Sequence, residues 1–198
     1  MSTPEHLIGE SAKTCYSTKK IDDGGKDITH NLVHGLQHLA VLRFAYATFD
    51  IRGISVACQN QLVRSKHLDF MVQSKRYVSA SKGNFSFVMP KNLNKEQQDI
   101  ARSAWDFSID TYNMLLNSGA KKEDARSVLP ANTSTDMMVT GNLQAMNDFF
   151  KLRLSSHAQE EIRDLANEMY TILQEKFPQV FTDALHAKYK GEPDNENT

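Results

Sequence analysis

Apolar residues recur at helical spacing along most of the chain. This pattern predicts helices over residues 4–16, 29–42, 54–63, 94–119, 122–128, 140–153 and from 156 to just before 178. Asn94 followed by Gln97 predicts a capping box at the start of the fourth helix, and Gly119 predicts its end. Ser156 followed by Gln159 predicts a second cap of the same kind.

Two segments alternate apolar and polar residues, as half-buried strands do. They are residues 43–51 and residues 84–89, the second of which ends at Pro90. Residues 17–26 form a polar loop, and residues 191–198 form a polar tail that we expect to be disordered. The pattern as a whole predicts an α+β fold in a single domain over residues 1–190, with long helices packed on a small antiparallel sheet.

Composition narrows the functional classes. The formal net charge of −1 over 198 residues gives no electrostatic argument for binding nucleic acid or a membrane. No apolar run approaches the ~20 residues of a membrane span, and the N-terminus does not resemble a signal peptide. Cys15 and Cys58 lie far apart, which argues against a disulfide framework or a metal site. We therefore expect a cytoplasmic protein without a metal ion.

Cations and hydrogen-bonding groups gather between residues 61 and 77. The segment contains Gln61, Arg64, Lys66 and His67, and ends in the run 74–77, SKRY. Guanidinium groups and hydroxyls in such numbers suit a phosphate monoester. The alternative is a solvated basic face with no ligand, which composition alone favours.

Two further places are candidates for chemistry. Arg126 stands at the end of a short predicted helix, where an arginine is ordinarily a partner of the helix dipole. Arg153 and His157 are four residues apart, with a helix break predicted between them, and a lone histidine there is more often a capping or interface residue. The sequence contains no nucleophile elbow, Walker loop, GxGxxG or HExxH motif. An enzyme built from this chain must therefore rely on a cofactor or on substrate activation by cations.

These same clusters resemble a known family. Residues 125–130, ARSVLP, together with Thr135 match ARxxLPxxxxT, and residues 142–169 match NxRxxxxFLxLRxxxHAQxEIRxxAxxM nearly throughout. Residues 38–49 and 53–55 resemble HxxxLEHxxxTF and GVS. These are motifs of flavin-dependent thymidylate synthases, and the resemblance extends over roughly residues 8–185.

The family's signature, RHRxxSxNExSxRY, is altered in this chain. Four of its positions match, at Arg64, Ser74, Arg76 and Tyr77. The departures are Ser65, Lys66, Asp69, Met71 and Val72, with Arg43 for a glutamate and Gln144 for an arginine in the neighbouring motifs. Most of the lost residues are flavin or folate contacts in the family. This sequence therefore retains the residues that bind the nucleotide in the family, one for one, but only part of those that bind the flavin.

The resemblance implies a role for each matching residue. The expected dUMP contacts are Gln61, Arg64, Ser74, Lys75, Arg76, Arg126 and Arg153. The expected FAD contacts are His38, Arg64, Ser65, Lys66, His67, Asn142, Asp148 and His157. Arg153 is the expected catalytic residue, because a fixed cation in a dry site stabilises negative charge that develops on the pyrimidine ring.

The implied reaction is methylation of dUMP at C5, with methylenetetrahydrofolate as carbon donor and FAD, reduced by NADPH, as mediator. The implied assembly is a homotetramer whose subunits share active sites. Two alternatives remain open. One is a related flavin- and folate-dependent hydroxymethyltransferase acting on a pyrimidine nucleotide. The other is a non-catalytic paralogue that binds nucleotides.

Overall fold

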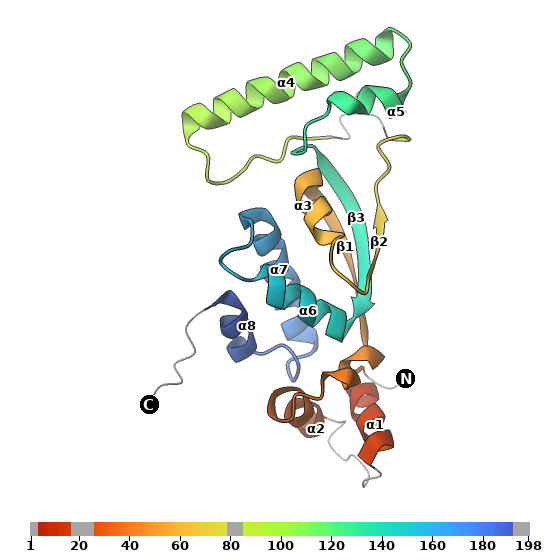
Figure 1. The fold of residues 1–198 in the computed structure, drawn as a ribbon, viewed down its shortest axis with the longest axis vertical. Helices are drawn as coiled ribbons and strands as arrows, with labels where there is room; N and C mark the ends of the chain where they lie inside the picture. The colour runs from red at the N-terminus through yellow and green to blue at the C-terminus, as the bar shows by residue number, and fades with distance from the viewer. Residues whose placement is uncertain (1–3, 17–25, 79–84, 192–198) are drawn as a thin grey trace. The chain divides into compact units, whose positions relative to one another are not determined.

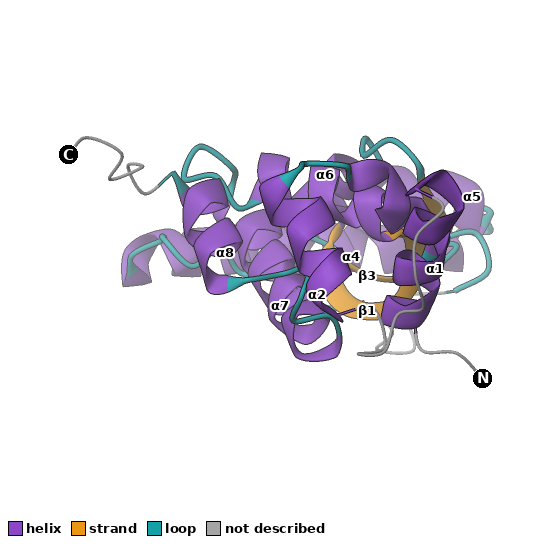
Figure 2. Cartoon of the chain, turned by 90° about the horizontal axis from the view of Figure 1, so that it is seen from below, coloured by secondary structure: helices purple, strands orange, loops and turns teal. Residues whose placement is uncertain are grey.

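Helices make up most of the chain in a computed structural model, which describes residues 4–16, 26–78 and 85–191 (Figures 1 and 2). The chain divides into two compact units. Unit 1 comprises Met1–Phe49, Ser65–Asp69 and Thr140–Thr198, and unit 2 comprises Asp50–Arg64 and Phe70–Val139. That residues 1–190 act as one domain stays a prediction, and all but Gly191 of the expected disordered tail lies outside the described residues.

The sheet has three strands: β1 (Tyr46–Ser55), β2 (Leu68–Val72) and β3 (Ser134–Asn142), in the order β1-β3-β2. Along β1, the Thr140 hydroxyl donates to the Ala47 carbonyl near one end, and Gly53 N donates to Asp136 Oδ1 near the other. β1 and β3 are therefore antiparallel. The predicted α+β class, with long helices and a small antiparallel sheet, is confirmed.

The expected strand at residues 84–89 is wrong. In the described part, 85–89, Phe87 forms only an isolated bridge with Thr133. The alternation has another cause, because Phe85 enters the core beneath a long helix and Phe87 stacks on Trp105 with ring centroids 5.6 Å apart. Apolar alternation here reflects packing against a helix rather than a ladder of backbone hydrogen bonds.

The single helix expected over residues 29–42 is also wrong. The structure has α2 (Lys26–His30), a π-helical turn (Asn31–Gly35) and a 3₁₀ helix (Leu39–Phe44). Gln37, between the last two, has a φ of 54°, in the left-handed region that a continuous α-helix excludes. Of the apolar residues at helical spacing, Leu32 and Val33 are buried, but Leu36 is 53% exposed. Three short helical pieces therefore bury only part of the face that one continuous helix was expected to bury.

In unit 2, α3 (Val56–Leu62) begins at Ser55, whose hydroxyl accepts from Cys58 N at 2.9 Å. Helix α4 (Lys95–Asn117) lies alongside α5 (Lys122–Ala125), which continues into a 3₁₀ turn (Figure 1). The capping box predicted for α4 is confirmed, with Asn94 and Gln97 bonded reciprocally at 3.0 Å.

In unit 1, α6 (Leu143–Arg153), α7 (Glu160–Lys176) and α8 (Asp183–Lys190) enclose an aromatic core. The break predicted after Arg153 is confirmed, but Ser156 is not a cap, because α7 begins at Glu160. The sequence pattern gave no indication of α8. Residues 140–142, expected to be helical, complete β3 instead.

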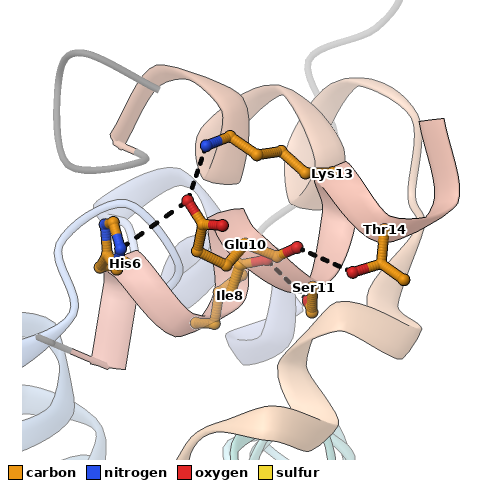
Figure 3. A network of polar contacts seen from close by, with 6 residues as sticks. All are labelled: His6, Ile8, Glu10, Ser11, Lys13 and Thr14. Atoms are coloured by element: carbon orange, nitrogen blue, oxygen red, sulfur yellow. Dashed lines mark hydrogen bonds and ion pairs between the residues drawn. The ribbon is translucent and has the colours of Figure 1, made fainter. Parts of the chain in front are cut away.

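Helix α1 (Pro4–Tyr16) matches its prediction and packs against α2 and the 3₁₀ helix. On this helix Lys13 Nζ lies 2.7 Å from Glu10 Oε1, and His6 Nε2 lies 3.7 Å from the same oxygen (Figure 3). Of the helices in the part of the chain that the structure describes, none has the length and hydropathy needed to cross a bilayer.

Candidate functional site

Arg76 and Arg126 are joined through one residue of α5. Arg76 donates to the same carboxylate oxygen of Glu123 from Nε, at 3.1 Å, and from Nη2, at 2.9 Å. Arg126 Nε donates to the backbone carbonyl of Glu123 at 3.2 Å. Two guanidinium groups that are 50 positions apart in the sequence thus gather around a single glutamate of unit 2.

A second contact holds the same two segments together. Lys122 Nζ donates to the Tyr77 carbonyl oxygen at 3.2 Å. The segment itself is a turn, in which Tyr77 N and Val78 N both donate to the Ser74 carbonyl and Arg76 N donates to the Ser74 hydroxyl at 3.3 Å. Ser74 and Arg76 therefore share one turn, which α5 contacts at two consecutive residues.

Gln61 and Arg64 belong to the same unit. Gln61 is half-buried on α3 and its amide donates to the Ala57 carbonyl at 3.4 Å. Arg64 lies exposed in the turn that follows α3. Of the seven residues expected to contact dUMP, all but Arg153 belong to unit 2.

Lys75 differs from its neighbours because its ammonium is turned toward the protein. Nζ donates to the Ser134 carbonyl at 2.8 Å and lies 4.3 Å from the centre of the Phe85 ring. Burial lowers the pKa of Lys75, and the nearby Asp136 partly opposes that effect. In the structure Lys75 ties the turn to β3, and its expected contact with dUMP stays a prediction.

The residues expected on the flavin side belong to unit 1, Arg64 excepted. His38 is exposed just before the 3₁₀ helix, Asp148 is exposed on α6, and His157 is exposed in the loop before α7. Arg153, half-buried, is the last residue of α6. Asn142 caps the same helix, its Oδ1 accepting from Ala145 N at 2.9 Å.

The altered signature residues lie beside the start of α6. Lys66 and His67 are exposed in the turn before β2, and His67 has a φ of 62°. Gly141 faces this turn so closely that a Cβ there would lie 3.2 Å from the His67 carbonyl oxygen and would clash with the Leu68 side chain. The turn that contains Ser65, Lys66 and His67 thus leads into β2 next to the segment that connects β3 to α6.

Two buried polar atoms occur at these altered positions. Ser65 Oγ and Gln144 Oε1 are both buried, and neither has a hydrogen-bond partner among the residues that the structure describes. A buried polar group without a partner costs about 1–3 kcal/mol, and a water, an ion or a ligand that satisfies it is one explanation for its presence. Within the same described part of the chain, no cluster of three or more His, Cys, Asp or Glu residues could hold a metal ion.

This architecture is that of a known class of proteins. The chain superimposes on the crystal structure of the flavin-dependent thymidylate synthase ThyX from Helicobacter pylori complexed with FAD and dUMP, with a TM-score of 0.78 and 22% identity. The alignment covers 91% of this chain and 95% of that one. This likeness establishes a ThyX fold.

Sequence comparison gives the family. Residues 1–179 match the family model described as thymidylate synthase complementing protein. The flavin-dependent thymidylate synthase of Geobacter sulfurreducens is 36% identical over 190 residues, covering 91% of this chain and 82% of the relative. That of Saccharolobus solfataricus is 32% identical over 186 residues, covering 89% and 71%. The chain belongs to the flavin-dependent thymidylate synthase family.

Two polar residues in these regions have surroundings that the sequence pattern does not indicate. Glu123 stands three positions before Arg126, but nothing in the local pattern connects it with Arg76, 47 positions away. The sequence marks Gln144 only as a departure from the family motif, and only the structure shows that its oxygen is buried without a partner among the described residues.

Proposed function

We propose that this chain methylates dUMP at C5, taking the carbon from methylenetetrahydrofolate and its reducing equivalents from NADPH, with FAD as cofactor. The products are dTMP, tetrahydrofolate and NADP⁺. Membership of the family and the joining of Arg76 and Arg126 at Glu123 carry this proposal.

The nucleotide phosphate would be held in unit 2. Arg76 and Arg126 place two positive charges beside the Ser74 turn, and a phosphate dianion accepts charge-assisted hydrogen bonds from guanidinium forks. Gln61 on α3 and Arg64 in the turn after it belong to the same unit and would add an amide and a third guanidinium. The phosphate anchors the nucleotide, so that its base can be oriented for reaction.

The chain's own residues fit a flavin, although several family contacts are replaced. Ser65 Oγ and Gln144 Oε1 are buried hydrogen-bonding atoms without partners in the described part of the chain, and Lys66 supplies a positive charge nearby in sequence. Lysine neutralises a diphosphate as a point charge, without the directed fork of arginine. His38, Asn142, Asp148 and His157 complete the proposed FAD contacts. When bound, FAD would supply the hydride chemistry that no side chain provides.

Arg153 is the proposed catalytic residue. It stands at the end of α6, half-buried and invariably charged. A guanidinium fixed in such an environment stabilises negative charge on a pyrimidine ring better than solvent does, because it needs no reorganisation during the reaction.

We also propose that the protein assembles into a homotetramer with shared active sites and works in the cytoplasm. Exposed apolar side chains on α4 support an association, since Ile100, Phe107 and Met114 are each at least 65% exposed at a spacing of seven residues. Light scattering at micromolar concentration should give the mass of four chains, and a stable monomer would contradict shared sites.

The proposed activity is tested by incubating the purified protein with FAD, NADPH, methylenetetrahydrofolate and dUMP, and identifying the nucleotide by mass. The proposal expects dTMP, and each omission of a component should abolish it. A product heavier than dTMP by one oxygen atom would identify the hydroxymethyltransferase alternative. Binding of dUMP without FAD binding or turnover would identify the non-catalytic paralogue.

A further inference from the structure

Glu123 is the only carboxylate bonded to Arg76 among the residues that the structure describes, and the geometry of this pair leaves part of the guanidinium available. One oxygen, Oε2, accepts from both Nε and Nη2, at 3.1 and 2.9 Å. A guanidinium has five N–H donors in a planar fork, so the edge formed by Nη1 and Nη2 keeps donors directed away from Glu123. A phosphate can bind to that edge without displacing the carboxylate.

The neighbouring contacts hold the backbone around Glu123 in place. Its backbone carbonyl accepts from Arg126 at 3.2 Å, and Lys122, one residue earlier, donates to the Tyr77 carbonyl at 3.2 Å. Arg76 is therefore bonded to Glu123 of α5, and α5 also contacts the turn that contains Arg76 through Lys122. By contrast, the Arg76 side chain is 56% exposed, so without Glu123 it would sample many rotamers.

We propose that Glu123 is a positioning residue for nucleotide binding: it orients the Arg76 guanidinium so that the opposite edge of that group receives the phosphate. The inference rests on the proposed function, in which Arg76 holds the dUMP phosphate. The competing possibility is that Glu123 acts as an anionic placeholder that dUMP must displace. The two make opposite predictions, because removing an orienting group weakens binding and removing a competitor strengthens it.

The experiment measures dUMP binding by calorimetry in Glu123→Ala and in the matched control Asp124→Ala. Both variants remove one negative charge from α5, but Asp124 is exposed, and of these two residues it is Glu123 that is bonded to Arg76. We expect Glu123→Ala to bind dUMP about fivefold more weakly than Asp124→Ala, in the range of an exposed ion pair. Binding of deoxyuridine, which lacks the phosphate, should be the same in both.

Two further variants assign the effect to Arg76. Glu123→Gln keeps an oxygen that accepts the same N–H groups and should restore affinity to within about twofold of the wild type. In an Arg76→Ala background, Glu123→Ala should change dUMP affinity no further, since a double-mutant cycle isolates the pair. In steady-state kinetics the loss should fall on KM for dUMP and leave kcat nearly unchanged.

The inference would be overturned if Glu123→Ala bound dUMP as tightly as Asp124→Ala or more tightly, or if its effect persisted without Arg76. Failure of the proposed function has a different signature. In that case the wild type would bind dUMP no better than deoxyuridine, whatever residue 123 is. If dUMP affinity depends on Arg76 but not on Glu123, only the inference about Glu123 fails.

Discussion

Replacing Arg76 with alanine tests the phosphate site directly. The side chain would donate charge-assisted hydrogen bonds, each of which contributes about 1.5–3 kcal/mol when one partner is ionised. Because Arg76 is 56% exposed, we take a value near the lower end, about 2 kcal/mol, which corresponds to roughly thirtyfold in Kd. The fold should persist, since the exposed pair with Glu123 contributes no more than about 1 kcal/mol.

Arg52→Ala is the matched control. Arg52 is also an exposed arginine of unit 2, and its Nη2 lies 2.8 Å from Asp50 Oδ2. Calorimetric titration with dUMP should show the thirtyfold loss in Arg76→Ala and less than about twofold in Arg52→Ala. Raising the salt concentration should weaken wild-type binding more than binding by Arg76→Ala, because one charge contact is missing from the variant. Equal affinities in the two variants would refute the phosphate site as we describe it.

Three further predictions concern the flavin, the acid stability and the core. Titration of the apo-protein with FAD should show weaker binding as the salt concentration rises, and Lys66→Gln should bind FAD less tightly than the control Lys95→Gln. No binding at tens of micromolar FAD, with or without dUMP, would contradict a flavoenzyme. Burial, together with the neighbouring His30, lowers the pKa of His34 below 6.5. At a pH just below 6.5 the unfolded chain therefore binds more protons than the folded chain, so the free energy of unfolding should fall as the pH falls. Urea titrations at several pH values should show a smaller fall in His34→Gln than in the control His6→Gln. Phe150→Ala should lower the free energy of unfolding by about 4 kcal/mol, because the ring is fully buried against Tyr170 and Phe181, with centroids 5.2 and 5.6 Å away. The exposed Leu152→Ala on the same helix should change it by less than about 0.5 kcal/mol, and similar losses in the two would refute that packing argument.

Features that depend on nearby residues were predictable from the sequence. The capping box of α4 joins Asn94 to Gln97, three positions apart, so both partners of its hydrogen bonds lie in one short segment of the sequence. The break after Arg153 and the extent of α1 are local in the same sense. The family motifs were also recognisable because they are strings of neighbouring residues, and the family match confirms that recognition.

Features that depend on distant partners were decided by the tertiary structure. Strand β3 contains Asp136 and Gly141, which are poor strand formers, and it is extended because it lies between β1 and β2, to which it is bonded along both edges. The expected strand at 84–89 has the alternating pattern of a strand, but its aromatic side chains pack against residues of α4.

The site follows the same division. The sequence supplied the types of residue, namely arginines, a serine and a glutamine within recognisable motifs. It could not supply the contact between Arg76 and Glu123, because a hydrogen bond across 47 positions requires the turn at Ser74 and helix α5 to be brought together by the fold. Nor could it reveal that the side-chain oxygens of Ser65 and Gln144 are buried without a partner among the described residues, since burial and hydrogen-bond satisfaction are properties of surroundings that only the folded chain creates.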